Sequence, residues 1–195
     1  INEKLPQKGG WFFQVREAAD GSLKLLEVAS RIAGTSGITR ATGVNLPLLT
    51  LNIFNGIDAD GVVVNDYHIE LDRALSNSFK VDLHYTDVYT DYDDTMVVDG
   101  KVNLEMITFL YKCLNEGKRI VLLTHHDGEL EPLLEDYRLD TIFDEVIHIE
   151  RGIPKYKYIT GEAPIFIDDS YGERKEVADH CHCPVFDTHT IEALL

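Results

Sequence analysis

The sequence is poor in basic residues. Lys and Arg total 18 against 34 Asp and Glu, so the formal net charge is −16. A nucleic-acid backbone would repel this chain unless the chain carried a local basic patch, and no such patch is visible in the sequence. We therefore expect no nucleic-acid partner.

Long apolar runs and regularly spaced cysteines are absent as well. No apolar run approaches the roughly 20 residues that span a bilayer, and no charged-then-apolar signal segment stands at the start. The cysteines Cys113, Cys181 and Cys183 are odd in number and irregular in spacing, which favours reduced thiols over a secreted disulfide framework. These absences predict a cytoplasmic protein with no membrane partner. Because the first residue is Ile1 rather than Met, we also expect a processed, truncated or partial chain.

The first third of the chain has the pattern of an antiparallel α+β unit. We expect strands over residues 11–17, 23–28, 67–71 and 78–83, a loop over 33–42 and a helix over 44–54. Gly21 suits the hairpin turn between the first two strands, because positive φ angles are cheap for glycine. Pro47 falls in the first turn of the expected helix, where its missing N–H is no loss.

Near residue 84 the pattern changes to alternating strands and helices. We expect strands over residues 87–90, 119–123, 145–149, 165–167 and 185–186, and helices over 104–116, 129–137, 173–179 and 190–194. Continuous apolar runs such as residues 120–123 are typical of strands buried on both faces of a parallel sheet. The sequence therefore predicts a doubly wound α/β domain over residues 84–195, packed against a smaller antiparallel α+β subdomain over residues 1–83.

Carboxylates gather where the predicted parallel strands end. Asp91 and Asp93 follow the first of these strands, Thr124 follows the second, and Asp168 and Asp169 follow the fourth. The carboxyl ends of parallel strands meet at one sheet edge, so two acidic clusters there would repel each other unless a divalent cation lay between them. All-oxygen ligands favour Mg²⁺ over zinc or copper. The sequence predicts a magnesium site at this edge.

Two other interpretations of the acidic residues are weaker. The spacing of Asp91, Asp93 and Thr95 matches the start of a calcium-binding EF-hand loop, but Met96 and Val102 stand where that loop needs Gly and Glu. A solvated acidic turn or a helix cap would explain either cluster alone. It would not explain why both occur together with a threonine and a lysine between them.

The run His180-Cys181-His182-Cys183 suggests zinc at first sight. Adjacent ligands are sterically awkward around one tetrahedral ion, and zinc sites usually need a second pair of ligands at a distance. We expect instead a turn that leads into the strand over residues 185–186.

The order of these residues resembles the haloacid dehalogenase superfamily in its phosphatase branch. The motif D-x-D-x-T follows a strand, a Thr ends the next strand, a Lys comes after it, and D-D-x-x-x-E follows a later strand, all within about residues 84–195. The resemblance implies that Asp91 is the nucleophile and Asp93 the general acid and base. It also implies that Thr124 holds phosphoryl oxygens and that Lys155 bridges the nucleophile and the phosphate.

The same resemblance implies the metal and substrate ligands. The implied ligands of Mg²⁺ are Asp91, Asp93, Asp168 and Asp169. Thr95 and His125 are expected to contact a small-molecule phosphate ester. Lys157 remains an alternative to Lys155, because both lie in one short segment.

The resemblance is to the capless type of this superfamily. The seven residues between Thr95 and the first helix, 96–102, leave room for a β-hairpin flap but not for a cap domain. The open site would then need a lid, either the missing part of an ATP-grasp domain or a second subunit.

Residues 9–56 resemble the carboxyl-terminal part of an ATP-grasp domain, especially that of the carbamoyl-phosphate synthase large chain. Gln14 and Glu27 match the metal ligands and Arg31 matches the arginine of that family, whereas Ala29 and Ser30 stand where Asn and Pro are usual. We expect this chain to lack the lysine-bearing strands and flexible lid that hold a nucleotide in that family. We therefore expect an ATP-grasp remnant over residues 1–83 that does not by itself carry out ATP-dependent ligation.

These patterns lead to a leading function and an alternative. The leading prediction is a Mg²⁺-dependent phosphomonoester hydrolase that acts through an aspartyl-phosphate intermediate. The alternative is the carboxyl-terminal fragment of an ATP-grasp ligase fused to a haloacid dehalogenase-like domain. A third interpretation, a binding module that keeps the metal site without turnover, is less favoured because both acidic clusters are intact.

Overall fold

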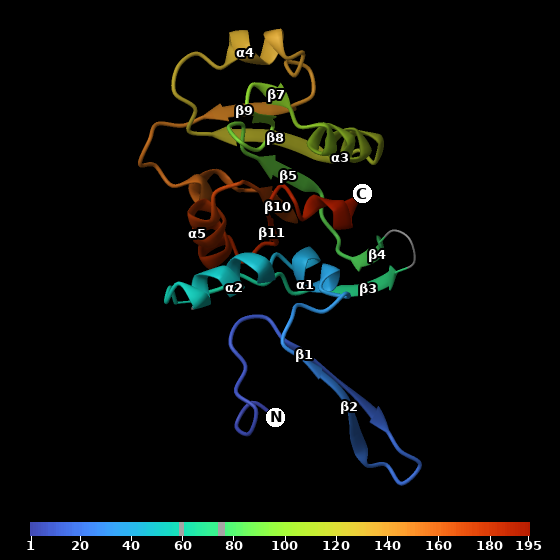
Figure 1. Ribbon diagram of the computed structural model, residues 1–195. Coiled ribbons are helices and arrows are strands. Elements are labelled where there is room, and N and C mark those ends of the chain that lie inside the picture. The colour runs from blue at the N-terminus through green and yellow to red at the C-terminus, as the bar shows by residue number, and fades with distance from the viewer. Residues whose placement is uncertain (59–60, 74–76) are drawn as a thin grey trace.

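The computed structural model describes residues 1–58, 61–73 and 77–195 (Figure 1). A parallel sheet with its helices forms one part of the molecule, and a smaller set of helices and hairpins lies against it. The first hairpin points away from the rest of the chain. Within the described ranges, no helix has the length and apolar character needed to cross a bilayer.

The parallel sheet has five strands. These are β5 (Asp87–Thr90), β8 (Arg119–Thr124), β9 (Glu145–His148), β10 (Pro164–Ile167) and β11 (Val185–Phe186), in the order β11-β10-β5-β8-β9. All four pairings in this sheet are parallel. The predicted mixed α/β architecture with a parallel sheet is confirmed.

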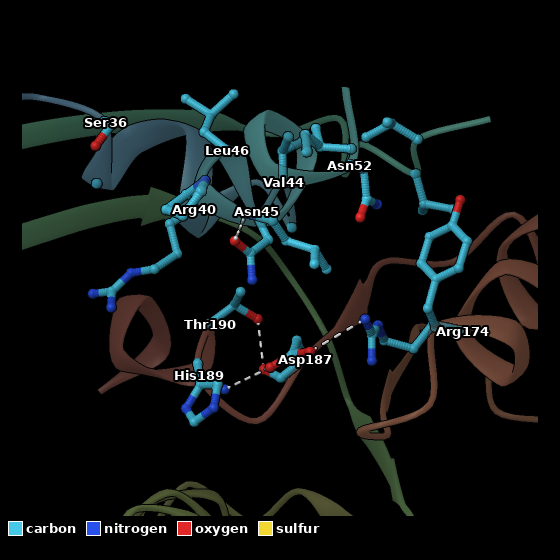
Figure 2. Close-up of a pocket in the computed structure, with 18 of the residues that line it drawn as sticks. Ser36, Arg40, Val44, Asn45, Leu46, Asn52, Arg174, Asp187, His189 and Thr190 are labelled. Atoms are coloured by element: carbon cyan, nitrogen blue, oxygen red, sulfur yellow. Dashed lines mark hydrogen bonds and ion pairs between the residues drawn. The ribbon is translucent and has the colours of Figure 1, made fainter. Parts of the chain in front are cut away.

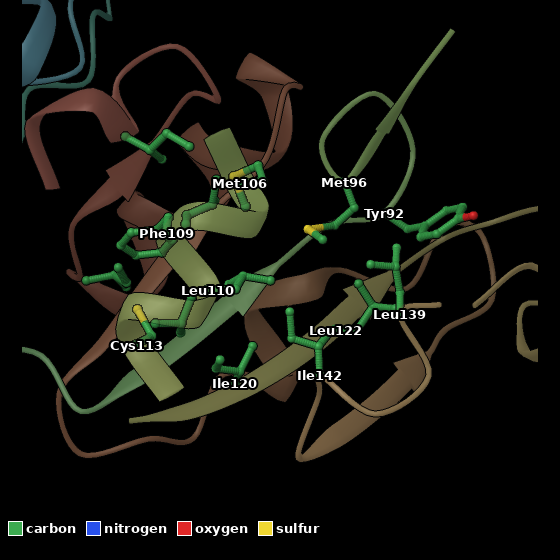
Figure 3. Packing of buried hydrophobic residues seen from close by; sticks show 14 of the residues in the cluster. Tyr92, Met96, Met106, Phe109, Leu110, Cys113, Ile120, Leu122, Leu139 and Ile142 are labelled. Carbon is green, nitrogen blue, oxygen red and sulfur yellow. The ribbon is translucent and has the colours of Figure 1, made fainter. Parts of the chain in front are cut away.

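Both faces of the sheet are buried, each by its own apolar cluster. Successive strand residues point to opposite sides and so join different clusters. Val88 packs into one apolar cluster with Phe109 of helix α3 (Leu104–Asn115), part of which Figure 3 shows. The neighbouring Tyr89 packs into a second cluster with Val177 of helix α5 (Tyr171–Cys181). Each fully buried side chain of this size stabilises the fold by roughly 1.5–3 kcal/mol.

Side-chain caps fix where the two long helices of this part begin. The Asn103 side-chain oxygen accepts hydrogen bonds from the N–H groups of Glu105 and Met106 at 3.1 and 3.4 Å, so α3 begins where the sequence predicts. Ser170 accepts from the N–H of Glu173 at 3.5 Å, and α5 therefore starts two residues earlier than predicted.

The remaining elements of this part are short. They are the two-stranded flap β6 (Val97–Val98) and β7 (Lys101–Val102), helix α4 (Glu131–Asp136), and the 3₁₀ turns η1 (Lys155–Tyr158) and η2 (Ile191–Leu194). The predicted flap is confirmed; Asp99 and Gly100, with φ of 49° and 68°, form its turn. The segment predicted as a terminal helix is a 3₁₀ turn, and η1 was not predicted.

The N-terminal part contains two hairpins and two helices. Its elements are β1 (Phe12–Glu17), β2 (Leu23–Ala29), α1 (Gly37–Ala41), α2 (Leu46–Phe54), β3 (His68–Arg73) and β4 (Asn77–Asp82). The strands and α2 are confirmed, with Asn45 as the N-cap of α2. The prediction of a continuous loop over residues 33–42 is wrong, because α1 forms there. The burial of Ala41, only 2% exposed, explains why packing overrides the weak helix propensity of a Gly-, Ser- and Thr-rich segment.

The two parts of the chain are in direct contact, as expected. The Asn65 side chain donates to the Val185 carbonyl at 2.6 Å and accepts from the Val185 N–H at 2.7 Å. These two hydrogen bonds occupy the outer edge of β11. The Tyr67 ring stacks on Phe186 with centroids 6.2 Å apart. The domain boundary near residue 83 stays a prediction.

Candidate functional site

The polar residues predicted to form a site lie at the carboxyl edge of the sheet. The chain leaves β5 to form β8 on one side and returns as β10 on the other, so the loops diverge between β5 and β10. Crevices that bind ligands form at such switch points. The Asp91 N–H donates to the Ile167 carbonyl at 3.0 Å, which draws the ends of these two strands together.

Three carboxylates converge in this crevice. Asp91, Asp168 and Asp169 each offer an oxygen, and these oxygens lie within 4.8 Å of one another. Asp91 and Asp168 are buried, 6% and 1% exposed, whereas Asp169 is open to solvent. An all-carboxylate donor set at the edge of the solvent fits Mg²⁺, which keeps several water ligands beside a few carboxylates.

One lysine partly neutralises these carboxylates. Lys155 Nζ donates to Asp91 Oδ1 at 2.7 Å and to Asp168 Oδ2 at 2.6 Å, and the side chain is 3% exposed. Burial opposes the ammonium charge, but attraction by the two carboxylates outweighs it and raises the pKa of Lys155. Lys157, the other candidate, is exposed on the same 3₁₀ turn.

The balance of charge shows why a cation fits. Three ionised carboxylates beside one ammonium group leave two uncompensated negative charges in a largely buried crevice. Burial, and then repulsion by Asp91, raise the pKa of Asp168 to about 7. Burial and the neighbouring carboxylates also raise the pKa of Asp169. A divalent cation would remove this cost, so these residues fit the magnesium site that the sequence predicts.

Backbone and hydroxyl contacts orient the two aspartates after β10. Asp168 Oδ1 accepts from the Ser170 N–H at 2.8 Å. The Asp169 N–H donates to Thr95 Oγ1 at 3.1 Å, and the Thr95 hydroxyl lies 3.5 Å from Asp169 Oδ1. Thr95 is fully buried, so its observed role is to hold Asp169, and its predicted contact with substrate stays a prediction.

Arg174 was not predicted as a site residue. Its guanidinium donates to the carbonyls of Asp168 and Asp169 at 2.6 and 2.7 Å, and it lies 3.2 Å from Asp187. Its side chain is 12% exposed. The only sequence signal is its place one turn into the helix that follows the paired aspartates. Arg174 fixes the backbone from which the two carboxylates project.

Thr124 lies at the end of β8 and faces the same edge. Its side chain is 1% exposed, and its hydroxyl has no hydrogen-bond partner among the residues that the structure describes. A buried polar group without a partner costs about 1–3 kcal/mol. A phosphoryl oxygen would satisfy this hydroxyl, and the predicted contact of Thr124 with substrate stays a prediction.

The structure does not bring the Asp93 carboxylate into the three-carboxylate group. The Asp93 side chain is 55% exposed and its two oxygens lie 2.8 and 3.0 Å from His126 Nδ1. His125, the predicted substrate contact, donates from Nε2 to the Ile153 carbonyl at 2.8 Å and has Nδ1 3.7 Å from Glu173.

The predicted ATP-grasp residues lie on the projecting hairpin or just after it. Gln14 and Glu27 are paired across β1 and β2, and both are exposed. The Arg31 guanidinium lies over the Phe12 ring at 4.9 Å. These three residues are on a different part of the chain from the carboxylate crevice (Figure 1).

The His-Cys run has structural contacts. The His180 ring stacks on Tyr156 with centroids 4.0 Å apart, and Cys181 Sγ donates to the Tyr156 carbonyl at 3.6 Å. Burial raises the pKa of Cys183 to about 12, which keeps the thiol protonated. In the described part of the chain, these side chains form no group able to hold a metal.

Comparison with known proteins relates the N-terminal part to ATP-grasp proteins. A family model described as "ATP-grasp in the biosynthetic pathway with Ter operon" matches residues 1–74, and this part of the chain is therefore ATP-grasp-related. No curated protein matches the chain. An uncharacterized protein from Corynebacterium glutamicum matches at a TM-score of 0.42 and 13% identity, over 53% of this chain and 83% of that one. A similarity at that level defines neither fold nor function.

Proposed function

We propose that the protein is a Mg²⁺-dependent phosphomonoester hydrolase that acts through an aspartyl-phosphate on Asp91. The observation that carries this proposal is the buried group at the β5–β10 edge, where Lys155 contacts both Asp91 and Asp168. Transfer of a phosphoryl group needs a nucleophile, a cation and hydroxyl donors in one place. Asp91, Lys155 and the unpartnered Thr124 hydroxyl supply these three kinds of group.

The first half of the reaction transfers the phosphoryl group to Asp91. A carboxylate oxygen of Asp91 forms a bond to phosphorus while the ester P–O bond breaks, and the leaving oxygen takes a proton from Asp93. His126, 2.8 Å from Asp93, is placed to supply that proton. Lys155 and Thr124 hold the oxygens of the transferring group.

The second half releases inorganic phosphate. Asp93 takes a proton from a water molecule, the water oxygen bonds to phosphorus, and the bond to Asp91 breaks. Because Asp93 is half-exposed and lies two residues after the nucleophile, its side chain has room to turn from His126 towards the reacting atoms. Magnesium held by Asp91, Asp168 and Asp169 would neutralise charge on the phosphoryl group and so let an anionic carboxylate approach it.

A generic aryl phosphate tests this proposal. Purified protein should hydrolyse it with Mg²⁺ and not after removal of the metal, and Asp91→Asn should lower the rate by about 10³-fold or more. Asp140→Asn, the same substitution at an exposed turn residue after α4, is the matched control. Equal activity of Asp91→Asn and the unaltered protein would contradict the mechanism.

A second candidate is the carboxyl-terminal fragment of an ATP-grasp ligase fused to the α/β part. The family match over residues 1–74 and the paired Gln14 and Glu27 favour it. The cheapest discriminator is the source gene before the codon for Ile1: a nucleotide-binding lid encoded there would support a ligase. Binding of a phosphate analogue such as vanadate without any turnover would instead favour a binding module.

A further inference from the structure

A cavity of about 760 Å³ lies between the N-terminal part and the α/β part of the chain. One side is formed by the segment around α1 and α2, and the other by the start of α5 and the loop after β11 (Figure 2). Its volume falls within the roughly 300–1,000 Å³ of ordinary small-molecule sites. None of the three site carboxylates is among its lining residues. The cavity is therefore separate from the crevice described above.

The N-terminal part contributes an aliphatic wall to the cavity. The aliphatic residues that line it are Val44, Leu46, Leu48, Leu49, Val62 and Val63. They come from the start of α2 and from the segment that crosses back towards the sheet. An apolar ring or chain of a ligand that packs against this wall is removed from water, and this transfer favours binding.

The charged groups on the wall are already paired. Arg40 forms an ion pair with Glu192. Arg174 lies 3.2 Å from Asp187 and also donates to the Asp168 and Asp169 carbonyls. Asp58, another carboxylate of the lining, has interactions of its own as well. Because each of these charged groups already has partners, the wall offers little unpaired charge to attract an ion.

Two amide side chains on the wall remain available. Asn45 Oδ1 accepts from the Leu48 N–H at 3.0 Å, but the Asn45 amino group has no acceptor among the described residues. The Asn52 amide likewise makes no hydrogen bond within the described ranges. Amides offer donors and acceptors together, so they can recognise a neutral group that does the same.

We propose that this cavity binds an uncharged amphipathic molecule with a ring-sized apolar body and an amide-like group at one end. The apolar body lies against the aliphatic wall, and the amide-like group pairs with Asn45 and Asn52. The contacts of Arg174 join this cavity to the backbone of the paired aspartates, so the ligand lies one side chain away from the carboxylate crevice. The site does not depend on the proposed hydrolase activity.

Three molecules of one shape test both the site and its preference for neutral ligands. Benzamide is neutral, benzoate is an anion and benzamidine is a cation. Titration of each into the full chain, followed by NMR and calorimetry, should give benzamide a Kd of about 1 mM, as expected of a fragment, and should give the two ions binding at least about tenfold weaker.

Variants place the binding in the cavity. Asn52→Leu replaces the amide by an alkyl group of similar size, and Leu49→Trp fills the cavity with a larger side chain. Each variant should weaken benzamide binding at least about fivefold. Asn115→Leu, the same substitution at an exposed residue of α3 outside the cavity, is the control and should bind like the unaltered protein. Circular dichroism confirms that each variant is folded.

Three results would overturn the proposal. The first is no benzamide binding at about 10 mM, well above the expected Kd. The second is equal or tighter binding of benzoate or benzamidine. The third is benzamide binding that folded Asn52→Leu and Leu49→Trp leave unchanged.

Discussion

The β1–β2 hairpin and the parallel sheet use similar apolar residues with opposite results. In the sheet, Val88, Tyr89 and Phe166 are fully buried. In the hairpin, Phe13 and Val15 are 49% and 44% exposed, because no other element of the described chain covers them. An isolated two-stranded hairpin is marginally stable in water. The comparison teaches that an alternating apolar pattern predicts a strand but not what covers it.

The same contrast applies to chemistry. Gln14 and Glu27 stand side by side on the hairpin with both side chains in solvent. Asp91 and Lys155 are 2.7 Å apart and buried, so their charges interact strongly. Water solvates Gln14 and Glu27, whereas little water separates Asp91 from Lys155. We therefore assign the proposed reaction to the sheet.

The largest expected difference between the sheet and the hairpin is the loss of stability when the same side chain is truncated in each. Phe166→Ala removes a fully buried ring from the centre of the sheet and should lower the free energy of unfolding by about 3–5 kcal/mol. Phe13→Ala removes a half-exposed ring of the hairpin and should cost under about 1 kcal/mol. Urea unfolding measures both. Similar losses from the two variants would show that the hairpin is covered in solution.

A lysine pair provides the next largest difference. Lys155→Ala should lower the rate of aryl phosphate hydrolysis by about 10²–10³-fold, because the transferring group loses its nearest cation. Lys157→Ala, two residues away and exposed, should leave the rate unchanged. Glu27→Ala on the hairpin should also have no effect. A loss of rate in either control would contradict the assignment of the reaction to the sheet edge.

Alkaline pH should destabilise the sheet through a buried thiol. Burial raises the pKa of Cys113 from 9.0 to about 11. The folded state therefore holds a proton that the unfolded state loses, so this contribution to stability is complete below pH 9 and is lost as pH rises towards 11. The expected loss is up to about 3 kcal/mol. Cys113→Ala should remove this part of the pH dependence in urea unfolding at pH 8, 9, 10 and 11; an unchanged slope would contradict the assignment.

The smallest effect is expected at Arg174, which joins the paired aspartates to the cavity between the two parts. Arg174→Lys cannot donate to both carbonyls and keep the contact with Asp187 in the same way, so the affinity for Mg²⁺ should fall by about tenfold. Calorimetric titration with Mg²⁺ measures this change. Arg151→Lys is the control, because Arg151 pairs with the exposed Asp127. Equal Mg²⁺ affinity in both variants would show that Arg174 does not position the paired aspartates.

Local patterns predicted much of the fold. The strands of the sheet are continuous apolar runs, and Asn103 and Gly117 mark the ends of α3 in the sequence. Helix α1 could not be predicted in this way, because its residues are poor helix formers held in place by the burial of Ala41. Elements that depend on packing between distant segments could not be predicted from local patterns.

The candidate site divides in the same manner. Asp91, Asp168 and Asp169 are recognisable because each follows a strand, and parallel strands end at one edge. The contacts of Arg174 and the pairing of Asp93 with His126 depend on side-chain directions that spacing does not give. Burial, which only the fold supplies, distinguishes Lys155 from Lys157.

The most direct measurement is to locate the phosphoryl group during turnover. Protein mixed with an aryl phosphate and Mg²⁺ is quenched in acid, and borohydride then reduces any aspartyl-phosphate so that mass spectrometry can identify the residue. The account predicts modification of Asp91 and none in Asp91→Asn. Continued hydrolysis with modification of another residue, or with none, would contradict it.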